Sequence, residues 1–187
     1  MPIEFKSAYN KSKDGGWLST ACKPEHGGMG VPVFFQAVTW AEIGTSTNMA
    51  MSVLPALTLG VYDVLIEHGE SSLVDYFATH LASGDWSGTM CLTEPHAGTD
   101  LGIISTKAVP QDDGTYRVTG TKIFITYGEH DMTENIVHLV LAKTPDAPEG
   151  TKGISLFLVP KFLPSDWKSG DLAGISHDIC SEHNGVT

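Results

Sequence analysis

The sequence predicts an α+β protein, in which an N-terminal α-helical bundle is followed by an antiparallel β-barrel or sandwich-like domain. Two observations predict this fold class. Apolar residues recur at helical spacing up to Ala82, whereas after Gly84 they gather into short runs separated by turn residues. We therefore expect a helical domain at residues 1–84 and a β domain at residues 85–187.

The strongest helical pattern lies just before the expected boundary. One apolar face is formed at i, i+3, i+4, i+7 and i+8 by Leu73, Tyr76, Phe77, His80 and Leu81. Upstream, residues 33–43 are apolar on almost every side and stop before Gly44, which predicts a buried helix closed by a C-terminal glycine. Pro55 interrupts the run at residues 48–64, so a kink or two helical pieces are expected there.

Short runs rich in β-branched and aromatic residues follow Gly84. We expect strands at Ser87–Thr93, Ile104–Val109, Tyr116–Thr126, Ile136–Ala142 and Ile154–Val159. Asp113-Gly114 predicts a hairpin between the second and third runs, and residues 146–153, rich in Pro and Gly, predict a loop between the last two. Residues 164–187 have no clear period and are interpreted as a chain that ends inside a domain.

Composition excludes several classes of protein. The 187 residues are 41% hydrophobic and 18% charged, which is ordinary for a globular chain. A net charge of −11 would repel a phosphate backbone, so nucleic acid is not an expected partner. Cys22, Cys91 and Cys180 lie too far apart for a disulfide framework, which favours a reducing, cytoplasmic compartment. No run has the length of a membrane span or signal peptide.

Two segments carry residues suited to a planar cofactor. They are CLTEPHAGTD at residues 91–100 and TKIFITYG at residues 121–128. Together they offer the short hydroxyls of Thr93, Thr99 and Thr126, a small-residue turn at 97–98 and the flat aromatic side chain of Phe124. A flavin ring needs hydrogen-bond partners at its polar edge and an apolar surface against one face. The segments therefore predict a flavin site.

Side-chain alternation in the expected strand would separate two faces of the second segment. Phe124 and Thr126 would point one way, and Ile123 and Ile125 the other, so one face could meet a cofactor while the opposite face packs into the core. Simpler interpretations stay open for each segment taken alone. TKIFITYG could be a surface strand with one core phenylalanine, and CLTEPHAGTD could be a tight turn capped by Thr93 and Asp100.

Both segments resemble the middle domain of the acyl-CoA dehydrogenase family, and PEHGGMG at residues 24–30 resembles a turn between its N-terminal helices. Residues 121–164 look most like the branch that acts on short or sulfur-containing thioesters, such as methylmercaptopropionyl-CoA. The resemblance implies FAD, an acyl-CoA substrate, and α,β-dehydrogenation with hydride transfer to flavin N5, as in fatty acid β-oxidation. It also implies a homo-oligomer in the complete enzyme and electron transfer to an electron-transferring flavoprotein.

The resemblance also assigns roles to single residues. Its cofactor-binding positions are Cys91, Leu92, Thr93, Gly98, Thr99, Phe124, Ile125 and Thr126. Leu92 and Thr93 would contact the pyrimidine edge of the flavin, and Thr99 would touch both flavin and acyl-CoA. Phe124 stands where the family usually has tryptophan, which keeps the apolar slab but loses the indole N–H, and Thr126 would bond near N5. Gly98 is expected to permit a positive φ.

One further departure from the family pattern and one carboxylate bear on the site. Ile103 stands where the family has a small residue, so the exit of the first segment is expected to differ. Glu94 is a candidate general base, but a local hydrogen-bonding role is preferred for it. The resemblance places the catalytic base in a C-terminal helical domain that is absent here, so no catalytic residue is assigned and little turnover is expected.

Two alternatives belong to other classes. The chain could be a non-catalytic binding or assembly module that has the family fold without holding flavin. His177, Cys180 and His183 stand at three-residue spacing and could be metal ligands, but no periodic pattern fixes them on one face. A solvated loop is therefore preferred for them, and no metal is expected.

Overall fold

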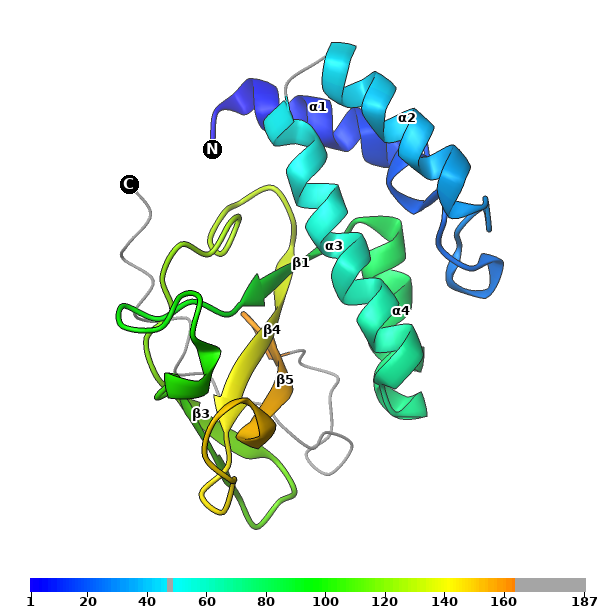
Figure 1. Ribbon diagram of the computed structural model, residues 1–187. Coiled ribbons are helices and arrows are strands. Elements are labelled where there is room, and N and C mark those ends of the chain that lie inside the picture. The colour runs from blue at the N-terminus through cyan, green and yellow to red at the C-terminus, as the bar shows by residue number, and fades with distance from the viewer. Residues whose placement is uncertain (47–48, 164–187) are drawn as a thin grey trace. The chain divides into compact units, whose positions relative to one another are not determined.

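The computed structural model describes residues 1–46 and 49–163. Within this part of the chain, four α-helices precede five β-strands, which confirms the α+β class (Figure 1). The described residues form two compact units. The helical unit comprises residues 1–88 and 130–135, and the sheet unit comprises residues 89–129 and 136–163.

The helical unit contains α1 at Ile3–Asp14, α2 at Val33–Ser46, α3 at Met49–His68 and α4 at Ser71–Ser83. Helix α1 was not predicted, because its mixed polar sequence has no clear apolar face. Tertiary contacts fix it instead: Tyr9 is buried and its hydroxyl donates to the carbonyl of Gly84 over 2.8 Å. Sequence periodicity misses a helix that is held by a single buried anchor.

Two expectations about the helices were wrong. Helix α2 continues through Gly44 to Ser46, and its apolar residues Val33 and Phe34 are each 72% exposed rather than buried. The missing side chain at Gly44 has a packing reason, because a Cβ there would lie 3.0 Å from the Ser52 hydroxyl on α3. Helix α3 runs through Pro55 as one element, which contradicts the expectation of two helical pieces, while the alternative of a kink stays a prediction.

The predicted apolar face of α4 is confirmed. Phe77 and Leu81 are buried, and Phe77 packs edge-on against Trp86 at a ring separation of 5.7 Å. His80 stacks on the same indole, with 4.3 Å between ring centroids. Gly84 ends the helix with φ of 77°, a left-handed conformation that favours glycine.

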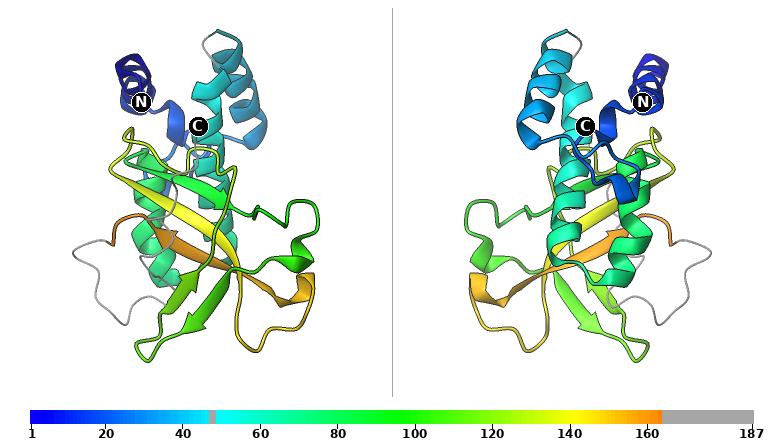
Figure 2. Two further views of the ribbon diagram at one scale, coloured as in Figure 1. Left: turned by 90° about the vertical axis from the view of Figure 1, so that its left-hand side faces the viewer. Right: turned by 90° about the vertical axis from the view of Figure 1, so that its right-hand side faces the viewer.

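The strands are β1 at Trp86–Cys91, β2 at Lys107–Pro110, β3 at Tyr116–Thr119, β4 at Asn135–Lys143 and β5 at Ile154–Pro160. Their order is β1-β4-β2-β3, and β5 pairs with β4. The β2–β3 and β4–β5 pairs are antiparallel, whereas β2 meets β4 in parallel at Lys107 and Lys143. Both hairpins can be followed in Figure 2, and the Asp113-Gly114 turn joins β2 to β3 as predicted.

Strand β3 is much shorter than the sequence suggested. It ends at Thr119 instead of Thr126, and residues 120–125 are not in a strand. Gly120 explains the change of direction, because a Cβ there would lie 2.3 Å from the Thr106 hydroxyl. Only glycine allows the two backbones to come this close.

Residues 130–135 return to the helical unit through a polar cluster. The Ser87 hydroxyl lies 3.1 Å from both His130 Nε2 and the Thr133 hydroxyl, and the Glu134 amide donates to the Asp85 carbonyl.

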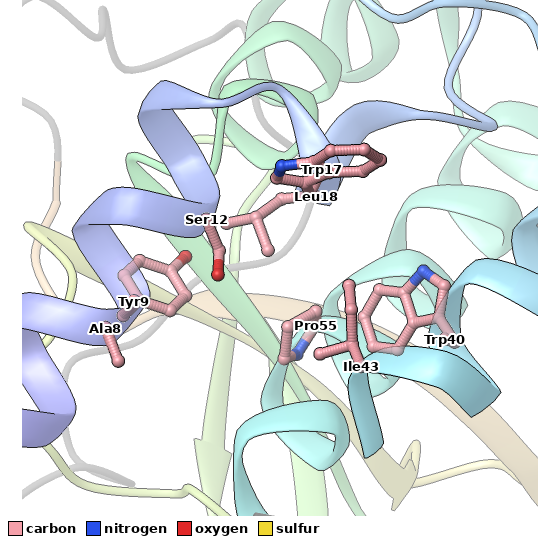
Figure 3. A pocket seen from close by; sticks show the side chains of 8 residues that line it. All are labelled: Ala8, Tyr9, Ser12, Trp17, Leu18, Trp40, Ile43 and Pro55. Carbon is pink, nitrogen blue, oxygen red and sulfur yellow. The ribbon is translucent and has the colours of Figure 1, made fainter. Parts of the chain in front are cut away.

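The helical unit also contains an apolar cavity of about 60 Å³, and Figure 3 shows the side chains that line it. Its walls include Trp17, Trp40, Ile43 and Pro55.

The PEHGGMG turn at residues 24–30 precedes α2. A one-turn 3-10 helix at Pro24–His26 is followed by Gly27 with φ of 86°. A Cβ at Gly28 would lie 2.0 Å from the Cys22 carbonyl oxygen, so no larger residue fits this turn. The glycines of this segment therefore serve a tight backbone crossing.

Candidate functional site

The CLTEPHAGTD segment leaves the end of β1 as a loop around a tight turn. The amide and carbonyl of Glu94 pair with the carbonyl and amide of Ala97 at 2.9 and 3.0 Å. Beyond the turn, the Asp100 carboxylate accepts a 2.9 Å hydrogen bond from the Gly102 amide and so begins a 3-10 helix at Leu101–Ile103. The predicted departure, Ile103, is 52% exposed at this exit.

The predicted site residues of this segment differ in accessibility. Leu92 and Thr93 are half-buried, and Thr99 is exposed. Cys91 has no solvent exposure, and its Sγ lies 3.7 Å from Nδ1 of the buried His138. The side chain of Cys91 therefore belongs to the core, which leaves only its backbone for a ligand.

Gly98 is exposed but does not adopt the expected positive φ. Among residues 1–46 and 49–163, no atom would lie within 4 Å of a Cβ at this position. The glycine is therefore not required by the protein's own backbone or packing. The open space above it is where a ligand can approach the main chain.

The TKIFITYG segment presents its aromatic ring to solvent. Phe124 is 85% exposed and has φ of 58°, whereas Ile125 is buried and Thr126 is exposed. The exposure of Phe124 and Thr126 and the burial of Ile125 agree with the expected separation, but strand alternation is not the reason, because the segment is an irregular loop. A left-handed conformation costs a non-glycine residue about 1–2 kcal/mol. Strained backbone of this kind gathers at functional sites.

Three hydrogen bonds join the two segments. The Ile123 amide donates to the Thr93 carbonyl at 2.9 Å. The Lys122 amine donates to the Leu92 carbonyl at 3.1 Å and to the Glu94 carboxylate at 2.9 Å. Segments that lie about thirty residues apart in the sequence are thereby brought side by side in the sheet unit.

Glu94 lies at the centre of this junction. Its carboxylate also accepts from the amides and hydroxyls of Ser105 and Thr106, at 2.5 to 3.0 Å, and His96 Nε2 lies 3.5 Å away. Burial raises the pKa of the carboxyl, but the hydrogen bonds from Thr106, Ser105 and Lys122 outweigh burial and lower it to about 2. An ionised carboxylate with this many donors is poorly suited to accept a substrate proton.

Several residues of the junction were not identified from the sequence. Ser105, Thr106 and Lys122 supply its donors, and Lys143 donates to the Gly102 carbonyl at 2.6 Å and so holds the loop exit. The sequence did indicate that Lys122 is unusual, because it is a lysine beside a run of apolar residues. A buried lysine requires an anionic partner, and Glu94 was the nearest candidate in the first segment.

Comparison with known proteins identifies the family. A family model described as "Acyl-CoA dehydrogenase, middle domain" matches residues 89–182, just over half of the chain. The chain belongs to the acyl-CoA dehydrogenase family. The match begins inside β1 and includes both segments of the candidate site.

Curated relatives carry the same family name. The chain is 52% identical to 3-methylmercaptopropionyl-CoA dehydrogenase of Ruegeria pomeroyi over 166 residues, covering 89% of this chain and 28% of that protein. It is 38% identical to a butyryl-CoA dehydrogenase of Syntrophomonas wolfei, covering 95% of this chain and 30% of the relative. The chain therefore spans slightly less than a third of the length of these acyl-CoA dehydrogenases.

Solved acyl-CoA dehydrogenase structures share the fold. Butyryl-CoA dehydrogenase from Megasphaera elsdenii matches with a TM-score of 0.70 at 26% identity, covering 80% of this chain and 39% of that one. An acyl-CoA dehydrogenase from Bacillus anthracis, solved in complex with FAD, matches with a TM-score of 0.70 at 22% identity, covering 84% and 26%. Members of the family thus bind FAD.

The residues of this acyl-CoA dehydrogenase chain fit FAD. Phe124 offers an exposed apolar ring, and the hydroxyls of Thr99 and Thr126 lie on exposed residues. A Cβ at Gly98 would meet no atom of the described residues within 4 Å. A flat heterocycle with polar edges requires this combination of an apolar slab, hydrogen-bonding groups and close access to the backbone.

Two other expectations bear on the described residues. Residues 1–46 and 49–163 contain no cluster of three or more His, Cys, Asp or Glu side chains that could hold a metal ion, and His177, Cys180 and His183 lie outside those ranges. Among the helices described, none is long and apolar enough to cross a membrane.

Proposed function

We propose that this chain is the N-terminal and middle portion of an FAD-dependent acyl-CoA dehydrogenase, and that its sheet unit forms one wall of the flavin site. Leu92 and Thr93 would bind the pyrimidine edge, Phe124 would lie against the ring, and Thr126 would bond near N5. Thr99 would contact both flavin and the acyl-CoA substrate. When bound, the flavin would supply the hydride acceptor for α,β-dehydrogenation of the thioester.

The observation that carries the proposal is the conformation of Phe124. A phenylalanine that is 85% exposed buries little apolar surface against its own chain, yet it has a strained backbone conformation. Burying such a ring against a ligand contributes about 1.5–3 kcal/mol. The hydrogen bond between Ile123 and Thr93 sets this ring beside the polar segment, as a flavin with one apolar face and one polar edge requires.

We infer that turnover needs more chain than these 187 residues. Dehydrogenation requires a base for the Cα proton, and Glu94 is already ionised and hydrogen-bonded to Ser105, Thr106 and Lys122. The relatives are more than three times as long, which leaves room for a base elsewhere in the whole protein. The residues of this chain would bind the flavin and the substrate and orient them for reaction, and they would not transfer the proton.

The relatives also suggest the substrate and the electron acceptor. The 52% identical relative acts on 3-methylmercaptopropionyl-CoA and another on butyryl-CoA, so a short or sulfur-containing acyl-CoA is proposed. A chain from a structure of the electron transferring flavoprotein of Acidaminococcus fermentans matches with a TM-score of 0.73 at 28% identity, covering 83% of this chain and 40% of that one. An electron-transferring flavoprotein is accordingly the proposed acceptor for the whole enzyme.

The test is an FAD titration of the purified chain, followed by flavin absorbance and fluorescence. We expect saturable binding that Phe124→Ala weakens at least about tenfold, because the apolar slab is lost. Phe34→Ala is the matched control, since Phe34 is an exposed phenylalanine of α2 in the helical unit. A colourless chain that takes up no FAD would overturn the proposal in favour of a non-catalytic module with the family fold.

A second measurement addresses turnover. Acyl-CoA-dependent reduction of a dye by the FAD-loaded chain is expected to be absent or very slow. Rapid dye reduction would show that the chain contains its own base and would overturn that part of the proposal, while leaving FAD binding intact.

A further inference from the structure

The ion pair between Glu94 and Lys122 is the most buried charged contact described in the sheet unit. Its two side chains are 0% and 1% exposed, and 2.9 Å separates Nζ from Oε1. The lysine comes from the TKIFITYG segment and the glutamate from CLTEPHAGTD. Neither side chain reaches solvent, so neither is free to meet substrate directly.

Stability alone is a weak reason for such a pair. Removing two charges from water costs several kcal/mol per ion, and well-packed apolar residues often stabilise a core equally well. What a buried ion pair adds is geometry, because charge-assisted hydrogen bonds hold their partners at short and directional distances. Five hydrogen bonds converge on the Glu94 carboxylate, from Ser105, Thr106 and Lys122.

The segments joined by this pair are largely irregular in structure. Residues 92–93 and 120–125 lie outside the strands, so no ladder of backbone hydrogen bonds fixes them. The Ile123 amide, which donates to Thr93, is the adjoining main-chain link. Lys122 thus anchors the chain two residues before the exposed ring of Phe124.

Phe124 is held from both sides. Before it lie the Lys122 and Ile123 contacts, and after it Ile125 is buried and its carbonyl accepts from the Gly128 amide at 3.0 Å. A phenylalanine keeps a left-handed backbone conformation only where several surrounding contacts hold it there. The Glu94 and Lys122 pair is the charged part of those surroundings.

We propose that Glu94 and Lys122 are positioning residues of the flavin site: the buried pair sets the position of Phe124 relative to Thr93, and so the fit of the chain to a flavin. This inference rests on the proposed function. It assigns no contact with flavin to either residue. Both act through the loop that carries the aromatic ring.

The test compares FAD affinity in single and double variants of the whole chain. Glu94→Gln keeps the shape of the side chain but turns an amide N–H toward the donors of Ser105. We expect this change to weaken FAD binding by about tenfold, a loss similar to that seen when supporting partners are removed at metal sites. In a Phe124→Ala background the same change is expected to alter affinity by less than about twofold, because the group that the pair positions is gone.

Two further variants separate positioning from folding. Lys122→Met leaves the four Ser105 and Thr106 hydrogen bonds to Glu94 in place, and serves if Glu94→Gln does not fold. Lys122→Arg retains the charge and is expected to recover part of the affinity that Lys122→Met loses. Glu129→Gln is the matched control, since it removes the ion pair with Lys161 elsewhere in the sheet unit.

Amide hydrogen exchange supplies a readout without FAD. We expect the Ile123 amide to exchange at least about tenfold faster in Glu94→Gln, relative to the amides of β4 as an internal reference. Unchanged exchange, or a loss of FAD affinity that is equal with and without Phe124, would overturn the positioning role alone. A wild-type chain that binds no FAD would overturn the proposed function and this inference together, so the two failures are distinguishable.

Discussion

The hydroxyl of Thr89 lies 2.7 Å from Nδ1 of His138, and neither residue has any solvent exposure. Thr89 comes from β1 and His138 from β4, strands that neighbour each other in the sheet. Cys91 Sγ lies 3.7 Å from the same ring nitrogen. The first segment of the proposed flavin site thus leaves the sheet directly beside a buried polar contact.

This contact predicts a stability change. Thr89→Val keeps the side-chain shape but removes a hydrogen bond to buried His138, so we expect unfolding free energy to fall by about 1–3 kcal/mol. Thr126→Val is the control, because Thr126 is exposed and its loss should change stability by less than about 0.5 kcal/mol. Urea unfolding of both variants measures the difference, and equal stabilities would contradict a structural role for Thr89.

The strained backbone at residue 124 predicts that a glycine there improves stability over an alanine but does not restore FAD binding. Phe124→Gly relieves the left-handed conformation, whereas Phe124→Ala removes the same ring but keeps a Cβ. We expect the glycine variant to be more stable than the alanine variant by about 1 kcal/mol, since the strain of about 1–2 kcal/mol exceeds the entropy cost of glycine. Thermal unfolding tests this, and both variants should bind FAD weakly. An alanine variant as stable as the glycine variant would argue against strain.

Glu94 predicts acid sensitivity in a defined range. Its folded pKa of about 2 lies below its usual 4.5, so the carboxylate contributes stability that is fully present above about pH 4.5 and is lost as pH falls toward 2. The difference corresponds to about 3 kcal/mol as an upper figure. Urea unfolding measured between pH 5 and 2 should show a smaller decline in Glu94→Gln than in the wild type. Parallel declines would exclude Glu94 as the source.

Gly98 and Gly120 form a matched pair for substitution. At Gly98 a Cβ meets no atom of the described residues within 4 Å, so Gly98→Ala should leave stability unchanged but hinder the approach of FAD. At Gly120 the Cβ would lie 2.3 Å from the Thr106 hydroxyl, so Gly120→Ala should destabilise by about 1–3 kcal/mol. Calorimetry and FAD titration separate the two effects. Normal FAD affinity in Gly98→Ala would show that flavin does not approach this backbone.

Local pattern was sufficient where one element buries one face. The periodic spacing of Phe77 and Leu81 predicted α4, because burial on one side imposes a repeat on the sequence. Short runs rich in β-branched residues predicted β4 and β5. Pattern failed at α2, whose all-round apolar sequence indicated burial while Phe34 is exposed. Hydropathy records what a helix can bury, and the elements around it decide what it does bury.

The candidate site was likewise predicted in part and misassigned in part. Residue types together with the family resemblance pointed to Thr93, Thr99 and Phe124, because a planar cofactor needs hydroxyls and a flat ring. They misassigned the reason for the exposure of Phe124, since a run of β-branched residues predicted a strand where the chain forms a loop with φ of 58°. Gly120 made that difference, through a close approach to Thr106 that no local rule contains.

The sequence by itself determined the α+β order of this protein, its acyl-CoA dehydrogenase resemblance and the residue types of a flavin site, because each is written in short-range pattern. A local hydrogen-bonding role for Glu94 was already preferred from the sequence, but only the tertiary structure decided its partners, among them Lys122. That outcome depends on Ser105, Thr106 and Lys122 converging on one carboxylate from 11, 12 and 28 residues away. Hydrogen bonding at such separations, and the pKa it lowers, arises from folding in three dimensions.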